Sequence, residues 1–306
     1  MRHRYLGIAG AFRPGTVVNG VTQATWKPTT PVVSTLVTSA DCASGSLTAD
    51  GMMGIFQAPD PVVPSPTVAT LAFVGFGGNG AAVCAAGFSG TDWSSASMVF
   101  DNASEAEPVV AIDGSGNSMV FASIIDPTAS VPSYVMTVGF RPSAATAWQI
   151  QGLNSGDDAA ALASAAFDGS GNAFVVWRPN SSSGKSVVYM TRRPAAGAWE
   201  PVQIVSAPTA VETRFPRLCV DPDGRALALF EQNFSAGAPF SVFGRLWKQG
   251  LWSDIAQVQT DTNEGRFADC PRNANLSQSP EVAWLETDPA NASQFRIMST
   301  LLQGAP

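Results

Sequence analysis

The chain repeats one sequence pattern about every 50 to 65 residues, and this period constrains the fold more than any other feature. The pattern is clearest in 106–122, 163–178 and 215–231. There an apolar run ends in Asp, a tight turn with Gly follows, and a second apolar run leads to an aromatic residue. The closing aromatic residues are Phe56, Phe121, Trp177, Phe230 and Trp284. Such a period is typical of folds built from one repeated supersecondary unit.

A second set of aromatic residues keeps the same period. Five tryptophans each open a short strand: Trp26, Trp93, Trp148, Trp199 and Trp252. A further strand lies between the two landmarks, as in 187–199, so each repeat supplies four strands. Four antiparallel strands per repeat, arranged around an axis, form the blade of a β-propeller. We therefore predict an all-β fold, a β-propeller with five four-stranded blades, with six blades as the alternative.

The predicted organisation is a single β-propeller domain over 1–306. Its repeats span about 26–92, 93–147, 148–198, 199–251 and 252–306, and 1–25 adds an extra or closing strand. We expect the strand from Trp26 to complete the last blade, which closes the ring between the N- and C-terminal strands. Tyr5–Phe12 then remains as an edge strand available for self-association. A missing N-terminal half-blade is the competing explanation.

Composition and charge narrow the class of protein. Hydrophobic residues make up 45% of the chain and charged residues 13%, and 28 Gly and 22 Pro suit many short strands joined by tight turns. The net charge of −7 offers no source for neutralising phosphates, which argues against a nucleic acid as partner. No apolar run is long enough for a transmembrane segment, and the N-terminal apolar stretch is too short for a convincing signal peptide.

The four cysteines have neither C-x-x-C spacing nor a nearby His, so a zinc site is not expected. One interpretation is that they are buried free thiols. The other is a disulfide, and the candidate pair is Cys42 with Cys270, because both follow Ala-Asp in matching places of the first and last repeats. Those two repeats are neighbours in a closed ring.

The repeat reads W-x-x-P-x-x-I, then P-x-V-A-x-D-x-x-G-N-A-x-x-V-W, then a strand ending in R-x-P, and 171–177 is its best copy. This pattern resembles a repeat of bacterial secreted or lipid-anchored β-propeller proteins, most of them uncharacterised. The resemblance implies a propeller and an extracellular, cell-surface or periplasmic location, and it brings no catalytic residues with it. The Asp-box of sialidase-like propellers is only faintly echoed by 168–177, so sialidase activity is not transferred.

The sequence lacks the residues that several kinds of catalysis and metal binding require. The single histidine, His3, lies beside the N-terminus. The chain therefore has no plausible base for a Ser-His-Asp triad or a Cys-His dyad, and no His-ligated metal centre is expected. Nucleotide-binding glycine motifs are absent. In the Asp-Gly turns we expect Asp to cap its own turn, and only Asp221 with Asp223 offers a weak candidate pair for calcium.

Two functional hypotheses follow. The first is a non-enzymatic, lectin-like extracellular or cell-surface binding propeller with a glycan or protein ligand, since equal repeats resemble a scaffold and no catalytic set is evident. The alternative is a carboxylate-dependent glycoside hydrolase or lyase, because glycoside hydrolysis can run on two Asp or Glu residues. The sequence singles out no carboxylate pair.

Strand direction predicts which end of the molecule binds. Alternating strands place the Asp-Gly turns and the turns after Arg141 and Arg193 at one end, and the longer connections at the other. We expect this second, loop-bearing end to be acidic. The candidate binding residues near its central opening are Asp41, Glu107, Asp158, Arg214 and Asp269. A cation, a basic partner or a sugar would suit such a surface, and a solvated surface without a ligand is the other interpretation.

Overall fold

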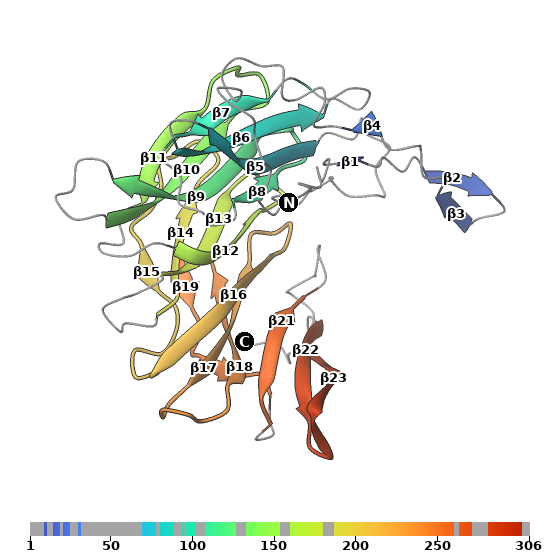
Figure 1. Ribbon diagram of the computed structural model, residues 1–306, viewed down its shortest axis with the longest axis vertical. Coiled ribbons are helices and arrows are strands. Elements are labelled where there is room, and N and C mark those ends of the chain that lie inside the picture. The colour runs from blue at the N-terminus through green and yellow to red at the C-terminus, as the bar shows by residue number, and fades with distance from the viewer. Residues whose placement is uncertain are drawn as a thin grey trace, which may run out of the picture.

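The computed structural model describes residues 9–10, 15–18, 21–24, 30–31, 69–77, 80–88, 94, 96–101, 108–126, 133–153, 160–179, 187–259, 263–270 and 281–301. Within these ranges every regular element is a β-strand, and neighbouring strands are antiparallel (Figure 1). Two small sheets near the N-terminus pair β1 (Ala9–Gly10) with β4 (Thr30–Pro31) and β2 (Gly15–Val18) with β3 (Val21–Ala24). No helix in the described residues has the length and apolar character that crossing a membrane requires.

Five larger sheets follow within the described residues. The first consists of β5 (Ala69–Gly77), β6 (Gly80–Phe88) and β7 (Ser97–Phe100). The second consists of β8 (Val109–Ile112), β9 (Ser118–Asp126), β10 (Ser133–Arg141) and β11 (Gln149–Leu153). The third consists of β12 (Ala160–Phe167), β13 (Ala173–Pro179), β14 (Tyr189–Arg193) and β15 (Gln203–Ile204).

The last two sheets lie nearest the C-terminus. The fourth consists of β16 (Glu212–Val220), β17 (Ala226–Asn233), β18 (Ser241–Lys248), β19 (Leu251–Trp252) and β20 (Ala256–Gln257), the last pairing with β18. The fifth consists of β21 (Gly265–Asp269), β22 (Glu281–Asp288) and β23 (Asn291–Leu301).

The first strands of consecutive sheets lie side by side: β5 contacts β8, β8 contacts β12, β12 contacts β16, and β16 contacts β21 (Figure 1). Each sheet then runs outward from this inner strand in chain order. This is a β-propeller, as the repeats predict. The strands that follow Trp148 and Trp199, β11 and β15, are the last strands of their sheets. In this part of the chain the sheets and the tryptophan-bounded repeats are therefore offset by one strand.

The predicted ring closure lies outside the described residues, because Trp26 and its flanking residues are not among them. Of the predicted edge strand Tyr5–Phe12, only Ala9 and Gly10 are described, and they pair with Pro31 and Thr30.

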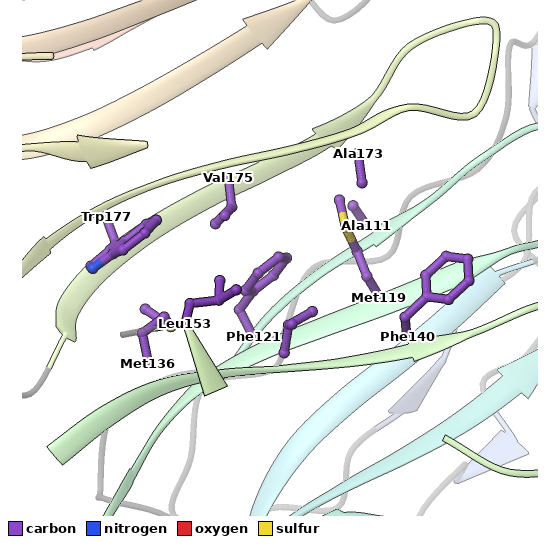
Figure 2. Packing of buried hydrophobic residues seen from close by; sticks show 10 residues of the cluster. Ala111, Met119, Phe121, Met136, Phe140, Leu153, Ala173, Val175 and Trp177 are labelled. Atoms are coloured by element: carbon purple, nitrogen blue, oxygen red, sulfur yellow. The ribbon is translucent and has the colours of Figure 1, made fainter. Parts of the chain in front are cut away.

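The core forms where the sheets pack face to face. Trp177 of β13 is fully buried and packs with Val175 against Phe121 and Met136 of the preceding sheet (Figure 2). Trp284 of β22, at the same phase of its repeat, is also buried. The two tryptophans are therefore buried equivalents, as predicted.

The Asp-Gly turns have the predicted local structure. The Asp168 carboxylate accepts hydrogen bonds from the backbone N–H groups of Ser170 and Asn172 at 2.9 and 2.8 Å, and Gly171 supplies a φ of +80°. The side-chain oxygen of Asn172 then accepts a 3.0 Å hydrogen bond from the N–H of Ala195, in the turn after Arg193. Asn117 and Ser143 repeat this link in the preceding sheet, so both kinds of turn share one end.

The predicted pairing of Cys42 with Cys270 is wrong. Cys270 forms a disulfide with Cys219, with 6.3 Å between their Cα atoms, and Cys84 is disulfide-bonded as well. Cys219 lies in β16 and Cys270 directly follows β21, and these two strands are neighbours. The bond therefore links the fourth and fifth sheets instead of the first and last. Cys42 itself lies outside the described residues.

Candidate functional site

One four-residue motif, Glu-x-Arg-Phe, occurs at 212–215 and again at 264–267, at the inner strands of the fourth and fifth sheets. In both places the pairing with the next strand slips just after the arginine. The phenylalanine of each motif has a left-handed backbone, with φ of 49° at Phe215 and 53° at Phe267. A bulky residue in this region costs about 1–3 kcal/mol, and such strain gathers at functional sites.

The bulge at Phe267 directs its backbone N–H at the carboxylate of Glu231, on β17 of the preceding sheet, at 2.5 Å. The other oxygen of Glu231 accepts a hydrogen bond of 2.9 Å from Nε of Arg214. Glu231 has no exposed surface. A glutamate with so little solvent persists only because these two donors satisfy its oxygens.

Arg214 also reaches the fifth sheet. Its Nη2 lies 2.8 Å from Oε1 of Glu264, and the same oxygen is 2.8 Å from Nη2 of Arg266. The Arg214 guanidinium stacks 3.4 Å from the ring centre of Phe240, which fixes its plane. One arginine therefore bridges two glutamates from consecutive sheets.

The two carboxyl groups differ in acidity. Burial raises the pKa of Glu231 to about 7, although the Phe267 N–H and the Arg214 charge both oppose this shift. The pKa of Glu264 is lowered, mainly by the hydrogen bond from Arg266 and also by that from Arg214, against the raising effect of burial. The pair can therefore present one protonated and one ionised carboxyl group near neutral pH, as acid–base catalysis requires.

A second buried carboxylate lies beside this cluster. Glu286 of β22 has no exposed surface and is paired with Arg296 of β23. Its Oε1 accepts a hydrogen bond of 3.0 Å from Nδ2 of Asn263, which directly precedes Glu264. The polar cluster thus continues across the fifth sheet.

Of the predicted binding residues, Arg214 belongs to this cluster. Asp269 is exposed at the end of β21, and its carboxylate accepts a hydrogen bond from the N–H of Cys270. Asp41, Glu107 and Asp158 lie outside the described residues.

The weak calcium candidates already have a cationic partner. The guanidinium of Arg225 is 3.0 Å from Asp221 and 3.7 Å from Asp223. Among the described residues no group of three or more metal-binding side chains is found.

Glu231 and Glu286 are not among the binding residues that the sequence predicts. Glu231 follows a closing aromatic residue in an apolar strand, and nothing local marks it as buried and charged. The signal that could have found the site is the recurrence of Glu-x-Arg-Phe one repeat apart, since a motif this polar in an inner strand requires partners in the neighbouring sheet.

Neither a family model nor a curated protein matches the chain. Solved structures of similar fold include an endo-arabinase from Bacteroides thetaiotaomicron, at 12% identity and a TM-score of 0.41, over 76% of this chain and 89% of that one. An α-L-arabinanase of Penicillium chrysogenum shows 12% identity and a TM-score of 0.46, over 82% of this chain and 86% of that one. The GH93 α-L-arabinofuranosidase of Fusarium graminearum shows 13% identity and a TM-score of 0.45, over 79% of this chain and 80% of that one.

These findings correct the first functional hypothesis. The three structures named above are those of enzymes, two arabinanases and an arabinofuranosidase, whereas sequence analysis favoured a non-enzymatic binding propeller and no enzyme activity. That interpretation rested on the equal repeats and on the lack of an evident catalytic set, whereas two carboxyl groups suffice for glycoside cleavage.

Proposed function

We propose that this chain is a carboxylate-dependent glycoside hydrolase, with Glu231 as the general acid and Glu264 as the ionised carboxylate. The observation that carries the proposal is that Arg214 bridges two glutamates whose pKa values are shifted in opposite directions. Pairs of this kind identify acid and base roles in sites that work at neutral pH.

Glycoside hydrolysis needs an acid that protonates the leaving oxygen and a carboxylate that acts as nucleophile or activates water. With a pKa of about 7, Glu231 keeps its proton up to neutral pH, and Glu264 stays ionised beside two arginines. Glu264 is 28% exposed, so it is open to a substrate. Glu231 is covered, so the proposal includes a shift of the Arg214 side chain when substrate binds.

The arginines support a lyase as the second candidate. A lyase acting on an acidic polysaccharide needs a base that removes a proton beside a carboxylate and cations that neutralise the developing charge. Arg214 and Arg266, exposed by 21% and 35%, are cations of this kind beside two carboxyl groups. The products separate the two candidates, because a lyase leaves an unsaturated sugar that absorbs ultraviolet light and a hydrolase does not.

The test is turnover of a panel of chromogenic glycosides and of neutral and acidic polysaccharides by the purified chain. Glu231→Gln and Glu264→Gln should each lower kcat by about a hundredfold or more. Glu281→Gln, at an exposed position at the start of β22, is the matched control and should leave kcat unchanged. Binding of a glycan without any turnover would contradict an enzymatic role.

The remaining expectations belong to this proposal. A disulfide such as Cys219–Cys270 is typical of oxidising compartments, which supports an extracellular or periplasmic location. A glycan is the proposed ligand. A protein partner, self-association through Tyr5–Phe12 and the resemblance to bacterial secreted repeat proteins stay predictions.

A further inference from the structure

Phe267 is an unusual residue for its position. Its side chain is 48% exposed, so burial contributes little to keeping it there. Its backbone has a φ of 53°, a conformation in which Gly or Asn is less strained. Neither packing nor backbone preference accounts for a phenylalanine at this place.

The exposed ring has a defined orientation and setting. Its centre lies 4.7 Å from that of Phe215, at an angle of 54° between the planes, so the equivalent residue of the preceding sheet supports it. The backbone N–H of Phe267 donates to Glu231, which ties the ring to the acid of the proposed reaction. Phe215 in turn lies 5.6 Å from the guanidinium of Arg214.

An arginine directly precedes each phenylalanine of this aromatic pair in the chain. Arg214, Glu264 and Arg266 are all partly exposed, and together they offer planar guanidinium donors and a carboxylate acceptor. The surface thus combines an apolar ring face with polar groups beside it. A sugar ring has the complementary form, with C–H groups on its faces and hydroxyl groups around its edge.

We propose that Phe267, supported by Phe215, is the stacking platform for one glycosyl unit of the substrate. The inference rests on the proposed function in placing this unit next to the glycosidic bond that is cleaved. The hydroxyl groups of the bound unit then face Arg214, Glu264 and Arg266. Phe267 is a binding residue in this arrangement, and its backbone N–H positions Glu231.

Binding is measured separately from turnover, in the Glu231→Gln background, by calorimetric titration with oligosaccharides of arabinan, xylan, galactan and ulvan. Phe267→Gly removes the ring and relieves the backbone strain, so it should weaken binding by about tenfold while leaving the thermal midpoint unchanged or higher. Phe267→Trp keeps an aromatic face and should retain binding within about threefold. Phe234→Ala, at a 50% exposed phenylalanine just after β17, is the control and should bind as the background does.

Loss of affinity in Phe267→Gly, with stability kept and with rescue by Phe267→Trp, would support the platform. Unchanged affinity in Phe267→Gly, or no binding of any oligosaccharide, would overturn it. The proposed function fails in a different way: glycan binding that depends on Phe267, without turnover in the chain with Glu231 intact, would leave the platform standing and remove the enzyme.

Discussion

The backbone N–H of Phe267 donates a hydrogen bond to the carboxylate of Glu231 in the preceding sheet. The donor is available because the bulge in β21 turns this amide away from the strand it would otherwise pair with. A strained backbone in one sheet thereby supplies a partner for a buried acid in the next.

The buried acid should make stability depend on pH. Between its ordinary pKa near 4.5 and its raised pKa of about 7, Glu231 keeps its proton in the folded chain and loses it in the unfolded chain. The free energy of unfolding should therefore fall as the pH rises through this window, by about 3 kcal/mol, and then level off. Urea unfolding from pH 5 to 8 measures the slope. Glu231→Gln should flatten it, and an equal slope in the variant would assign the effect to another group.

Of the two aspartates in the turn at 221–225, only Asp221 should contribute to the free energy of unfolding. Asp221 is buried and accepts hydrogen bonds of 2.8 Å from the N–H of Arg225 and 3.0 Å from its guanidinium. Asp221→Ala should lower the free energy of unfolding by about 1–3 kcal/mol. Asp223→Ala is the matched control, because this side chain is 72% exposed, and it should change stability by less than about 0.5 kcal/mol.

The same turn tests the calcium candidate. Because Arg225 already pairs with both carboxylates, we expect added calcium to leave the melting temperature of the wild-type chain unchanged. A rise in melting temperature that disappears in Asp223→Ala would instead show a calcium site at this turn.

The disulfide should stabilise the join between the fourth and fifth sheets. Cys219 and Cys270 are 51 residues apart, and cross-linking a loop of this length is worth about 4 kcal/mol in the chain-entropy account. The double variant Cys219→Ala/Cys270→Ala should therefore unfold at a clearly lower urea concentration than wild type, without reductant. Using the variant, and not a reductant, leaves the disulfide of Cys84 intact. An unchanged midpoint would show that the bond adds nothing to stability.

Gly265, in the second Glu-x-Arg-Phe motif, should not tolerate a side chain. A Cβ atom there would overlap the side-chain oxygen of buried Gln259 and lie 3.0 Å from Val242. Gln259 has little room to withdraw, because its Nε2 donates a 2.7 Å hydrogen bond to the backbone of Asn263. Gly265→Ala should cost about 1–3 kcal/mol of unfolding free energy, against little effect from Gly114→Ala, where no atom lies within 4 Å. Equal midpoints for the two variants would contradict this.

The sheets could be predicted from the sequence because residues close together in each repeat specify its strands and turns. The Asp168 turn, for example, is specified by residues within four positions of one another, and the aromatic period marks the strand that is buried between sheets. Sequence alone could therefore predict an all-β propeller, the turn structures and the burial of Trp177 and Trp284.

The site escaped sequence analysis because its contacts are not local. Glu231 is held by Arg214, 17 residues before it, and by Phe267, 36 residues after it in another sheet. The cysteine prediction failed for a similar reason. The position of Cys270 within its repeat places it beside a neighbouring sheet. That position alone does not say whether the neighbouring sheet is the preceding or the following one in the ring.

The side-chain amide links from Asn117 to Ser143 and from Asn172 to Ala195 limit where the chain can be lengthened by protein engineering. Where two turns are linked in this way, lengthening one of them also displaces the other. A foreign segment inserted between Asp168 and Asn172 would therefore remove both the Asp cap and the amide link.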